Sequence, residues 1–278
     1  MQRQHRFSSW FVAGSLALCG SWAAVQAQQP ARQPPTAADW TAVAKLPDFT
    51  GVWEIGLGGP APRGAPPPGR GADGAARGRG RGAAGPSLTP EYAAKKKAFD
   101  ASPPEDSEAA NCLPPGMPGI MAQPYPMEFL LTPGQVSIVI EAYTQVRHIY
   151  TDGRPLPDDP DLKFHGTSVG RWEGDALVVD TVGFSPLTLL DRGVPHGDKM
   201  RIHERFRLTD PDTMVIETTV TDPDALTMPY TSNRTLRRHR NWTIAEYVCE
   251  ENNRNSVDAS GKARVNLAGP SGSPTKKD

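Results

Sequence analysis

Cysteine and the sequence motifs of common enzymes are scarce in this chain of 278 residues. The three cysteines are Cys19, Cys112 and Cys249, and no Cys-x-x-Cys spacing is present, which argues against a zinc site made of thiolates. The chain also lacks a Gly-x-Ser-x-Gly elbow, a Walker loop, a dinucleotide-binding fingerprint and a Cys/His nucleophile pair. These absences argue against the hydrolases, nucleotide-binding enzymes and thiol enzymes that such motifs mark.

An excess of charge of one sign is also absent, since 30 basic residues face 31 acidic ones. A nearly neutral chain gives no reason to expect nucleic acid, a membrane surface or a polyanionic substrate as partner. Residues 77–82 read Arg-Gly-Arg-Gly-Arg-Gly and resemble RNA-binding tracts, but they lie in a Gly/Pro/Ala/Arg stretch, residues 57–86, with almost nothing to bury. We interpret that stretch as a disordered, solvated insertion.

The long hydrophobic run of the chain lies at its start, in residues 7–25, after a basic segment that holds Arg3 and Arg6. A short apolar run behind basic residues and before Val25-Gln-Ala27 is typical of a secretory signal peptide, not of a membrane span. Cys19 raises a lipoprotein alternative, but Leu18 is large where such cleavage sites need a small residue. We therefore predict a signal peptide at residues 1–27, a linker at residues 28–47, and a periplasmic or secreted protein.

Export would leave two cysteines, Cys112 and Cys249. In an oxidising compartment two remaining cysteines more often pair than stay free, so we predict a disulfide between them. Two metal-binding thiolates are the alternative, and no ligand spacing supports it.

Short β-rich runs separated by turn residues make up most of the remaining chain. They are residues 48–55, 127–132, 135–141, 143–151, the two strands of residues 170–184, and residues 200–208, 213–221, 231–239 and 242–249. About ten strands at hairpin spacing predict an all-β antiparallel meander, closed as a barrel or folded as a sandwich, over residues 48–254. One helix is expected after the N-cap Thr89, at residues 90–99, and a disordered tail at residues 255–278.

The hairpin of residues 170–184 is the most strongly specified element. Glu173-Gly174-Asp175 supplies turn chemistry between two β-rich runs. In its second strand Asp180 shares one face with Val178 and Val182, and both faces are largely apolar. This pattern predicts a central strand in which Asp180 is not freely solvated.

Three carboxylates, Glu204, Asp180 and Glu246, fall on apolar faces of expected strands, whereas His203 falls on a solvent face. Unpaired buried carboxylates are costly. They either pair with arginines such as Arg147 and fix strand register, or one of them has a raised pKa suited to proton transfer in a pocket.

Histidines offer a second set of candidates. Alternation places His148 in the interior opposite Arg147, and His165 and His196 lie in loops near the expected barrel mouth. With an inward carboxylate these three histidines would suit zinc, but no His-x-His or His-Glu-x-x-His spacing occurs, so we predict no metal. The basic run of residues 234–240 is expected to face solvent.

Residues 144–252 resemble a family of uncharacterised exported bacterial proteins. The phrases that carry the resemblance are Ile-Tyr-Thr-Asp-Gly-Arg (149–154), Gly-Arg-Trp-Glu-Gly-Asp-Ala-Leu-Val-Val-Asp-Thr-Val-Gly-Phe (170–184), Glu-Arg-Phe (204–206), Asp-Pro-Asp (222–224) and Cys-Glu-Glu-Asn (249–252). The resemblance implies a lipocalin-like β-barrel but no reaction. Gly51-Val-Trp53 also has the Gly-x-Trp form that opens lipocalin-type barrels. Thr167 stands where members of the family carry His, so a histidine cluster is not required.

Such barrels hold small apolar or aromatic molecules at the mouth. The leading hypothesis is an exported enzyme with cofactor-independent acid–base chemistry, of lyase, isomerase or hydratase type. Its catalytic candidates are Glu204, Asp180, His196 and His148, and its substrate-binding candidates are Arg171, Trp172, Tyr150, Arg154 and Glu246. The alternatives are a non-catalytic carrier of a hydrophobic small molecule and a structural envelope protein.

Overall fold

The computed structural model describes residues 34–56, 85–102, 111–191 and 193–249, and the backbone of residues 256–257 and 263–264. The predicted signal peptide, the first six residues of the linker and nearly all of the low-complexity insertion lie outside these residues. The described residues from Pro35 onward belong to one unit.

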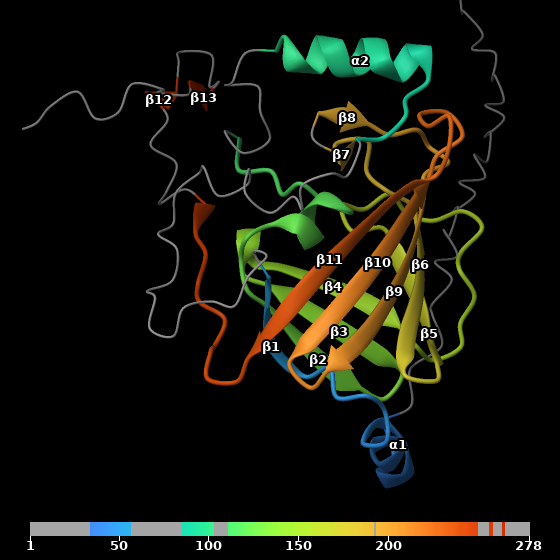
Figure 1. Cartoon of the computed structure of the whole chain (residues 1–278), viewed down its shortest axis with the longest axis vertical. Helices are drawn as coiled ribbons and strands as arrows, with labels where there is room; N and C mark the ends of the chain where they lie inside the picture. The colour runs from blue at the N-terminus through green and yellow to red at the C-terminus, as the bar shows by residue number, and fades with distance from the viewer. Residues whose placement is uncertain are drawn as a thin grey trace, which may run out of the picture. The chain divides into compact units, whose positions relative to one another are not determined.

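Nine strands close into a barrel (Figure 1). They are β1 (Gly51–Ile55), β2 (Met127–Thr132), β3 (Gln135–Ile140), β4 (Gln145–Tyr150), β5 (Thr167–Glu173), β6 (Ala176–Val182), β9 (Arg201–Asp210), β10 (Thr213–Thr221) and β11 (Tyr230–His239). Around the barrel the order is β1-β11-β10-β9-β6-β5-β4-β3-β2, and β2 pairs with β1 to close it. The predicted all-β class and the barrel are confirmed.

Two features of the sheet differ from the predicted antiparallel meander. Strands β4 and β5 pair in parallel, because the chain of residues 151–166 returns across the barrel before β5 begins. The strand expected at residues 242–249 does not form. At its C-terminal half β11 already pairs with β10 on one side and with β1 on the other, so no sheet edge is left there for another strand.

The helices are α1 (Ala37–Val43) and α2 (Pro90–Asp100). Helix α2 was predicted, although the Thr89 hydroxyl donates to the Asp224 carbonyl, at 2.9 Å, and does not cap the helix. Helix α1 lies inside the predicted linker and was missed, although Thr36 and Asp39 form a capping box, a known start signal for helices. In the expected disordered tail, β12 (Ser256–Val257) pairs with β13 (Ala263–Arg264).

One end of the barrel is closed by Trp53, which is fully buried. Its indole nitrogen donates to the Phe49 carbonyl at 2.9 Å, the Arg238 guanidinium lies 4.5 Å from the ring centroid, and Phe129 meets the ring edge-on. The tryptophan of the Gly-x-Trp motif thus plugs this end. Buried side chains from the 3-10 helix η4 (Gly119–Ala122) and from the small sheet of β7 (Leu189–Asp191) and β8 (Val194–Pro195) belong to the same core.

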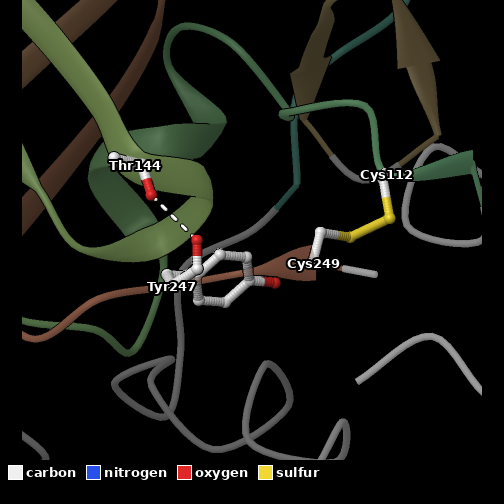
Figure 2. Close-up of a disulfide and its surroundings, with 4 residues drawn as sticks. All are labelled: Cys112, Thr144, Tyr247 and Cys249. Atoms are coloured by element: carbon white, nitrogen blue, oxygen red, sulfur yellow. Dashed lines mark hydrogen bonds between the residues drawn. A yellow bond between two sulfur atoms is a disulfide. The ribbon is translucent and has the colours of Figure 1, made fainter. Parts of the chain in front are cut away.

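The predicted disulfide joins Cys112 to Cys249, whose Cα atoms are 5.8 Å apart (Figure 2). The segment before Cys249 lies against the turn η5 (Ala142–Thr144). There the Thr144 hydroxyl donates to the Tyr247 carbonyl at 2.9 Å, and the Ala245 amide donates to the Glu141 carboxylate at 3.0 Å. The chain after β11 is therefore held as a strap beside the barrel.

Candidate functional site

Polar side chains form a belt inside the barrel, on six neighbouring strands. We name this set the inner polar belt: Arg147, Ser168, Thr181, Glu204, Thr218, Ser232 and Arg234 on β4, β5, β6, β9, β10 and β11. Strand register places the members side by side, since Glu204 pairs with Thr218 and Thr218 with Ser232. The opposite wall, formed by β1, β2 and β3, is apolar, with Trp53, Phe129 and Ile138 fully buried. The inner face thus mixes polar and apolar side chains on the belt strands and is apolar on β1–β3.

A buried ion pair lies at the centre of the belt. The Arg147 guanidinium donates to both carboxylate oxygens of Glu204, to Oε1 at 3.1 Å and to Oε2 more closely, and both side chains are 0–1% exposed. Arg147 also donates to the hydroxyls of Ser168, at 3.3 Å, and Thr181, at 3.2 Å. The inward orientation predicted for Glu204 is confirmed. Both oxygens of Glu204 accept hydrogen bonds from Arg147. The carboxylate is therefore not available to take a proton from a substrate.

Arg234 is a second guanidinium on the inner face, because its register partner Ile216 points into the core. It donates to the Ser232 hydroxyl at 3.4 Å. Burial lowers the pKa of Arg234, since loss of water disfavours the charged form, while interactions with Glu204, Tyr230 and Asp191 act in the opposite direction. The basic run that begins here was expected to face solvent, so this residue was missed. Alternation with Leu236, which is fully buried, was the signal that could have found it.

Two buried polar atoms in and near the belt have no hydrogen-bond partner among the described residues, Nε2 of His165 and the hydroxyl of Thr218. The other ring nitrogen of His165, Nδ1, lies 3.2 Å from the Val146 carbonyl and so donates to it, which leaves Nε2 as a bare acceptor. Burial, followed by the positive charge of Arg147, lowers the pKa of His165 to about 4. The neutral imidazole is therefore the form present at neutral pH.

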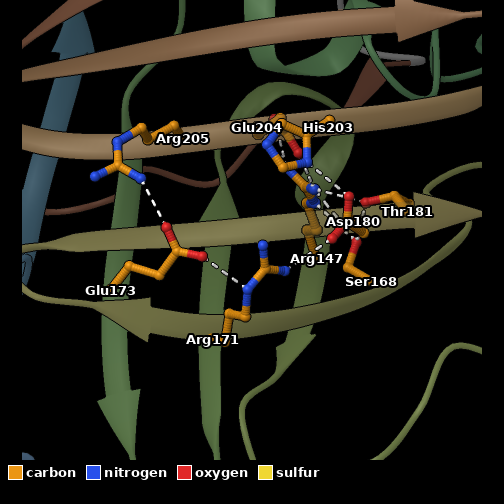
Figure 3. A network of polar contacts seen from close by, with 9 residues as sticks. All are labelled: Arg147, Ser168, Arg171, Glu173, Asp180, Thr181, His203, Glu204 and Arg205. Atoms are coloured by element: carbon orange, nitrogen blue, oxygen red, sulfur yellow. Dashed lines mark hydrogen bonds and ion pairs between the residues drawn. The ribbon is translucent and has the colours of Figure 1, made fainter.

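On the outer surface of the same strands lies a second polar group, here called the outer network: Arg171, Glu173, Asp180, His203 and Arg205 (Figure 3). The Asp180 carboxylate accepts hydrogen bonds from Nδ1 of His203, at 2.7 Å, and from Nη1 of Arg171, at 3.0 Å. Its side chain is 36% exposed, so the prediction that Asp180 faces the interior is wrong. Arg205, followed by Arg171, holds the pKa of Glu173 below its ordinary value.

The remaining β4 candidates also lie outside the barrel. Arg147 and Ile149 point inward, so His148 is exposed on the outer face, where its Nδ1 lies 3.1 Å from the Ser137 hydroxyl; the prediction that His148 lines the interior is wrong. Tyr150 shares that outer face, and the Arg154 guanidinium stacks over its ring at 3.8 Å.

His196, Trp172 and Glu246 occupy three further places. Trp172 packs on Phe49 with ring centroids 5.2 Å apart, near the plugged end. Glu246 is exposed on the segment after β11, which corrects its predicted place on an apolar strand face. His196 packs against Phe184, and its ring nitrogens lie 2.8 Å from the Gly197 carbonyl and 2.9 Å from the Ser185 carbonyl.

His196 also borders an open groove of about 860 Å³ beside the start of α2. Two carboxylates of this groove are already paired with lysines, Glu91 with Lys95 at 2.8 Å and Asp224 with Lys199 at 3.3 Å. A third carboxylate, Asp198, also lines the groove. Of the four predicted catalytic residues, His196 alone lines it, so the four are not gathered at one point.

Within the described residues no three His, Cys, Asp or Glu side chains are grouped as a metal site requires. The absence of a bound metal stays a prediction. None of the helices that the structure describes is long and apolar enough to cross a membrane.

No family model and no curated protein matches the sequence. Among solved structures, a crystal structure of a variant of the fluorescent protein UnaG is similar, with 15% sequence identity and a TM-score of 0.30. The alignment covers 69% of this chain and 96% of that protein. The likeness is distant, and the closed barrel follows from the strand pairing of this chain itself.

Proposed function

We propose that this protein is a non-catalytic carrier of a small molecule, which it binds inside the barrel. The observation that carries the proposal is the inner polar belt, which faces an apolar wall and holds a hydroxyl and a guanidinium that protein groups leave largely unsatisfied. Buried polar groups are normally hydrogen-bonded, and an unsatisfied one in a barrel interior suits a bound partner.

The arrangement of the carboxylates favours a carrier over the acid–base enzyme. Glu204 accepts two hydrogen bonds from Arg147, whereas Asp180 lies on the other surface of the sheet beside His203. A general acid and base must reach the same substrate, and these two carboxylates face opposite sides of one strand pair. The binding function needs no such pair.

The carrier acts outside the cytoplasm, in the periplasm or beyond it. The signal-like sequence of residues 1–27 and the disulfide between Cys112 and Cys249 support this location, because structural disulfides persist in oxidising compartments.

Titration of the purified protein with Nile red, a neutral apolar dye, tests the carrier function. We expect saturable binding with one dye per chain, an emission shift to shorter wavelength, and a melting temperature that rises with the logarithm of dye concentration. Native mass spectrometry of protein purified from its own source should show a copurified organic molecule whose mass stays unchanged on incubation with the protein. A chemical change in that molecule would support the enzyme instead.

Neighbouring residues of β11 offer a matched pair of variants. Ser232→Trp places a large side chain in the belt and should abolish dye binding, whereas Asn233→Trp adds the same side chain to the exposed outer face and should leave it intact. Circular dichroism and melting curves check that both variants fold. Equal dye binding by the two variants would place the dye outside the barrel and contradict the proposal.

A further inference from the structure

Arg234 differs from Arg147 in the way its charge is compensated. Glu204 holds Arg147 through two hydrogen bonds, but no carboxylate of the described residues lies within ion-pair distance of Arg234. The belt therefore contains two guanidinium groups and one carboxylate, and the carboxylate is taken by Arg147. An arginine side chain stays protonated in proteins, so a positive charge is left without a contact partner.

Three groups from different elements act electrostatically on Arg234. Glu204 lies on β9, Tyr230 on its own strand, and Asp191 on the small sheet β7–β8. Each acts on Arg234 through space, and within the described residues the guanidinium of Arg234 makes a long hydrogen bond, of 3.4 Å, to the Ser232 hydroxyl. The guanidinium thus keeps most of its five donor hydrogens available for a bound molecule.

Water reaches this part of the interior. The inward-facing residues Tyr230, Ser232 and Arg234 are half-buried, whereas Leu236, one turn of the alternation further along β11, is fully buried. Strand β1 pairs with β11 from Leu236 onward, so within the described residues the earlier part of β11 pairs with β10 alone. This is the side from which a small molecule can reach Arg234.

We propose that the carried molecule has an apolar body and a carboxylate, and that Arg234 binds the carboxylate. The flat guanidinium fork matches the two oxygens of a carboxylate through parallel hydrogen bonds. The unpartnered hydroxyl of Thr218, diagonal to Arg234 across the β10–β11 ladder, is placed to donate a further hydrogen bond. The apolar wall of β1–β3 receives the body of the molecule. This inference rests on the proposed carrier function.

The test compares naphthalene-2-carboxylate with naphthalene-2-carboxamide, which has nearly the same shape but no charge. Isothermal titration of the full chain should give a carboxylate affinity higher than the amide affinity by a factor on the order of 10 to 100, the usual strength of hydrogen bonds to charged groups. In Arg234→Gln that preference should vanish while amide binding changes little. Arg237→Gln, on the exposed face of the same strand, should behave as the unaltered protein.

The outcomes separate the two proposals. If the unaltered protein binds the amide as tightly as the carboxylate, or if Arg234→Gln keeps the preference, the role of Arg234 is overturned while the carrier function stands. If neither naphthalene compound nor Nile red binds, the carrier function itself is overturned. If Arg237→Gln also loses the preference for the carboxylate, that preference comes from the overall positive charge of β11, and the role of Arg234 is again overturned.

Discussion

The part of the sheet made of strands β4, β5, β6 and β9 carries an arginine–carboxylate cluster on each of its two surfaces (Figure 3). Thr181 and Glu204 belong to the inner polar belt, while their immediate neighbours Asp180 and His203 belong to the outer network. The inner ion pair is 0–1% exposed, whereas Asp180 and Arg171 are 36% and 57% exposed. Similar chemical groups, one residue apart in the chain, thus lie in the buried interior on one surface and in water on the other.

Position relative to water decides what each cluster contributes. An exposed ion pair is screened and adds little to stability, whereas a buried charge that loses its partner has no solvent to replace it. The inner belt should therefore be sensitive to single substitutions and the outer network tolerant of them.

Glu204→Gln is the strongest test of this contrast. The substitution keeps the volume but leaves the Arg147 guanidinium buried without a countercharge, so the free energy of unfolding should fall by about 3–5 kcal/mol. Urea denaturation followed by circular dichroism measures the change. A loss below about 1 kcal/mol, as for a surface pair, would remove the distinction between the two clusters.

The double variant Arg147→Met with Glu204→Leu is the matched control. Both charges leave together, apolar side chains fill the space, and the hydroxyls of Ser168 and Thr181 keep their mutual 2.9 Å hydrogen bond. Most of the stability lost in Glu204→Gln should return. A double variant as unstable as the single one would show that shape, and not charge, dominates this site.

His165 predicts a smaller, pH-dependent effect. Its pKa of about 4 in the folded protein lies below the ordinary 6.5, so between these values the unfolded chain binds the proton and the folded chain does not. The free energy of unfolding should therefore decrease as the pH falls from 6.5 to 4, by about 2–3 kcal/mol, and this contribution is fully present above pH 6.5.

Denaturation curves across that pH range measure the effect in His165→Asn, whose side chain can still donate to the Val146 carbonyl but does not titrate. The slope of stability against pH should flatten in His165→Asn. An unchanged slope in His165→Asn would contradict the burial of the His165 ring.

The smallest effect is expected for Asp180→Asn. The change removes one carboxylate from exposed contacts with Arg171 and His203, so stability should fall by about 0–1 kcal/mol, and less in high salt. A loss approaching that of Glu204→Gln would show that the outer network is not solvated as its exposure indicates.

Much of the fold could be read from the sequence because turns and alternation are local properties. The hairpin of residues 170–184 turns at Gly174, whose φ of +63° suits glycine, and the expected strand pairs follow it in order. The parallel pairing of β4 and β5 could not be read, because it depends on where residues 151–166 carry the chain. The expected strand at residues 242–249 failed because neighbouring strands already occupy its sheet edge.

The site was only partly predictable, for a related reason. Glu204 was placed correctly because β9 has one polar and one apolar face. Strand β6 is apolar on both faces, since Val178 and Val182 are buried on the outer side as well, so alternation could not tell which face Asp180 joins. On β4 the charged residue is the inward one, which the usual rule for arginine does not anticipate, and His148 was placed inside instead of Arg147.

Because of the disulfide between Cys112 and Cys249, the outcome of a protease cut depends on where in the barrel it falls. Eight of its nine strands, β2 to β11, lie between the two cysteines, which are 137 residues apart, and β1 precedes them. A single cut between the cysteines leaves two fragments that migrate as one chain until a reductant separates them. A single cut between β1 and Cys112 instead frees the fragment that contains Trp53, which hydrogen bonds and packing alone then retain.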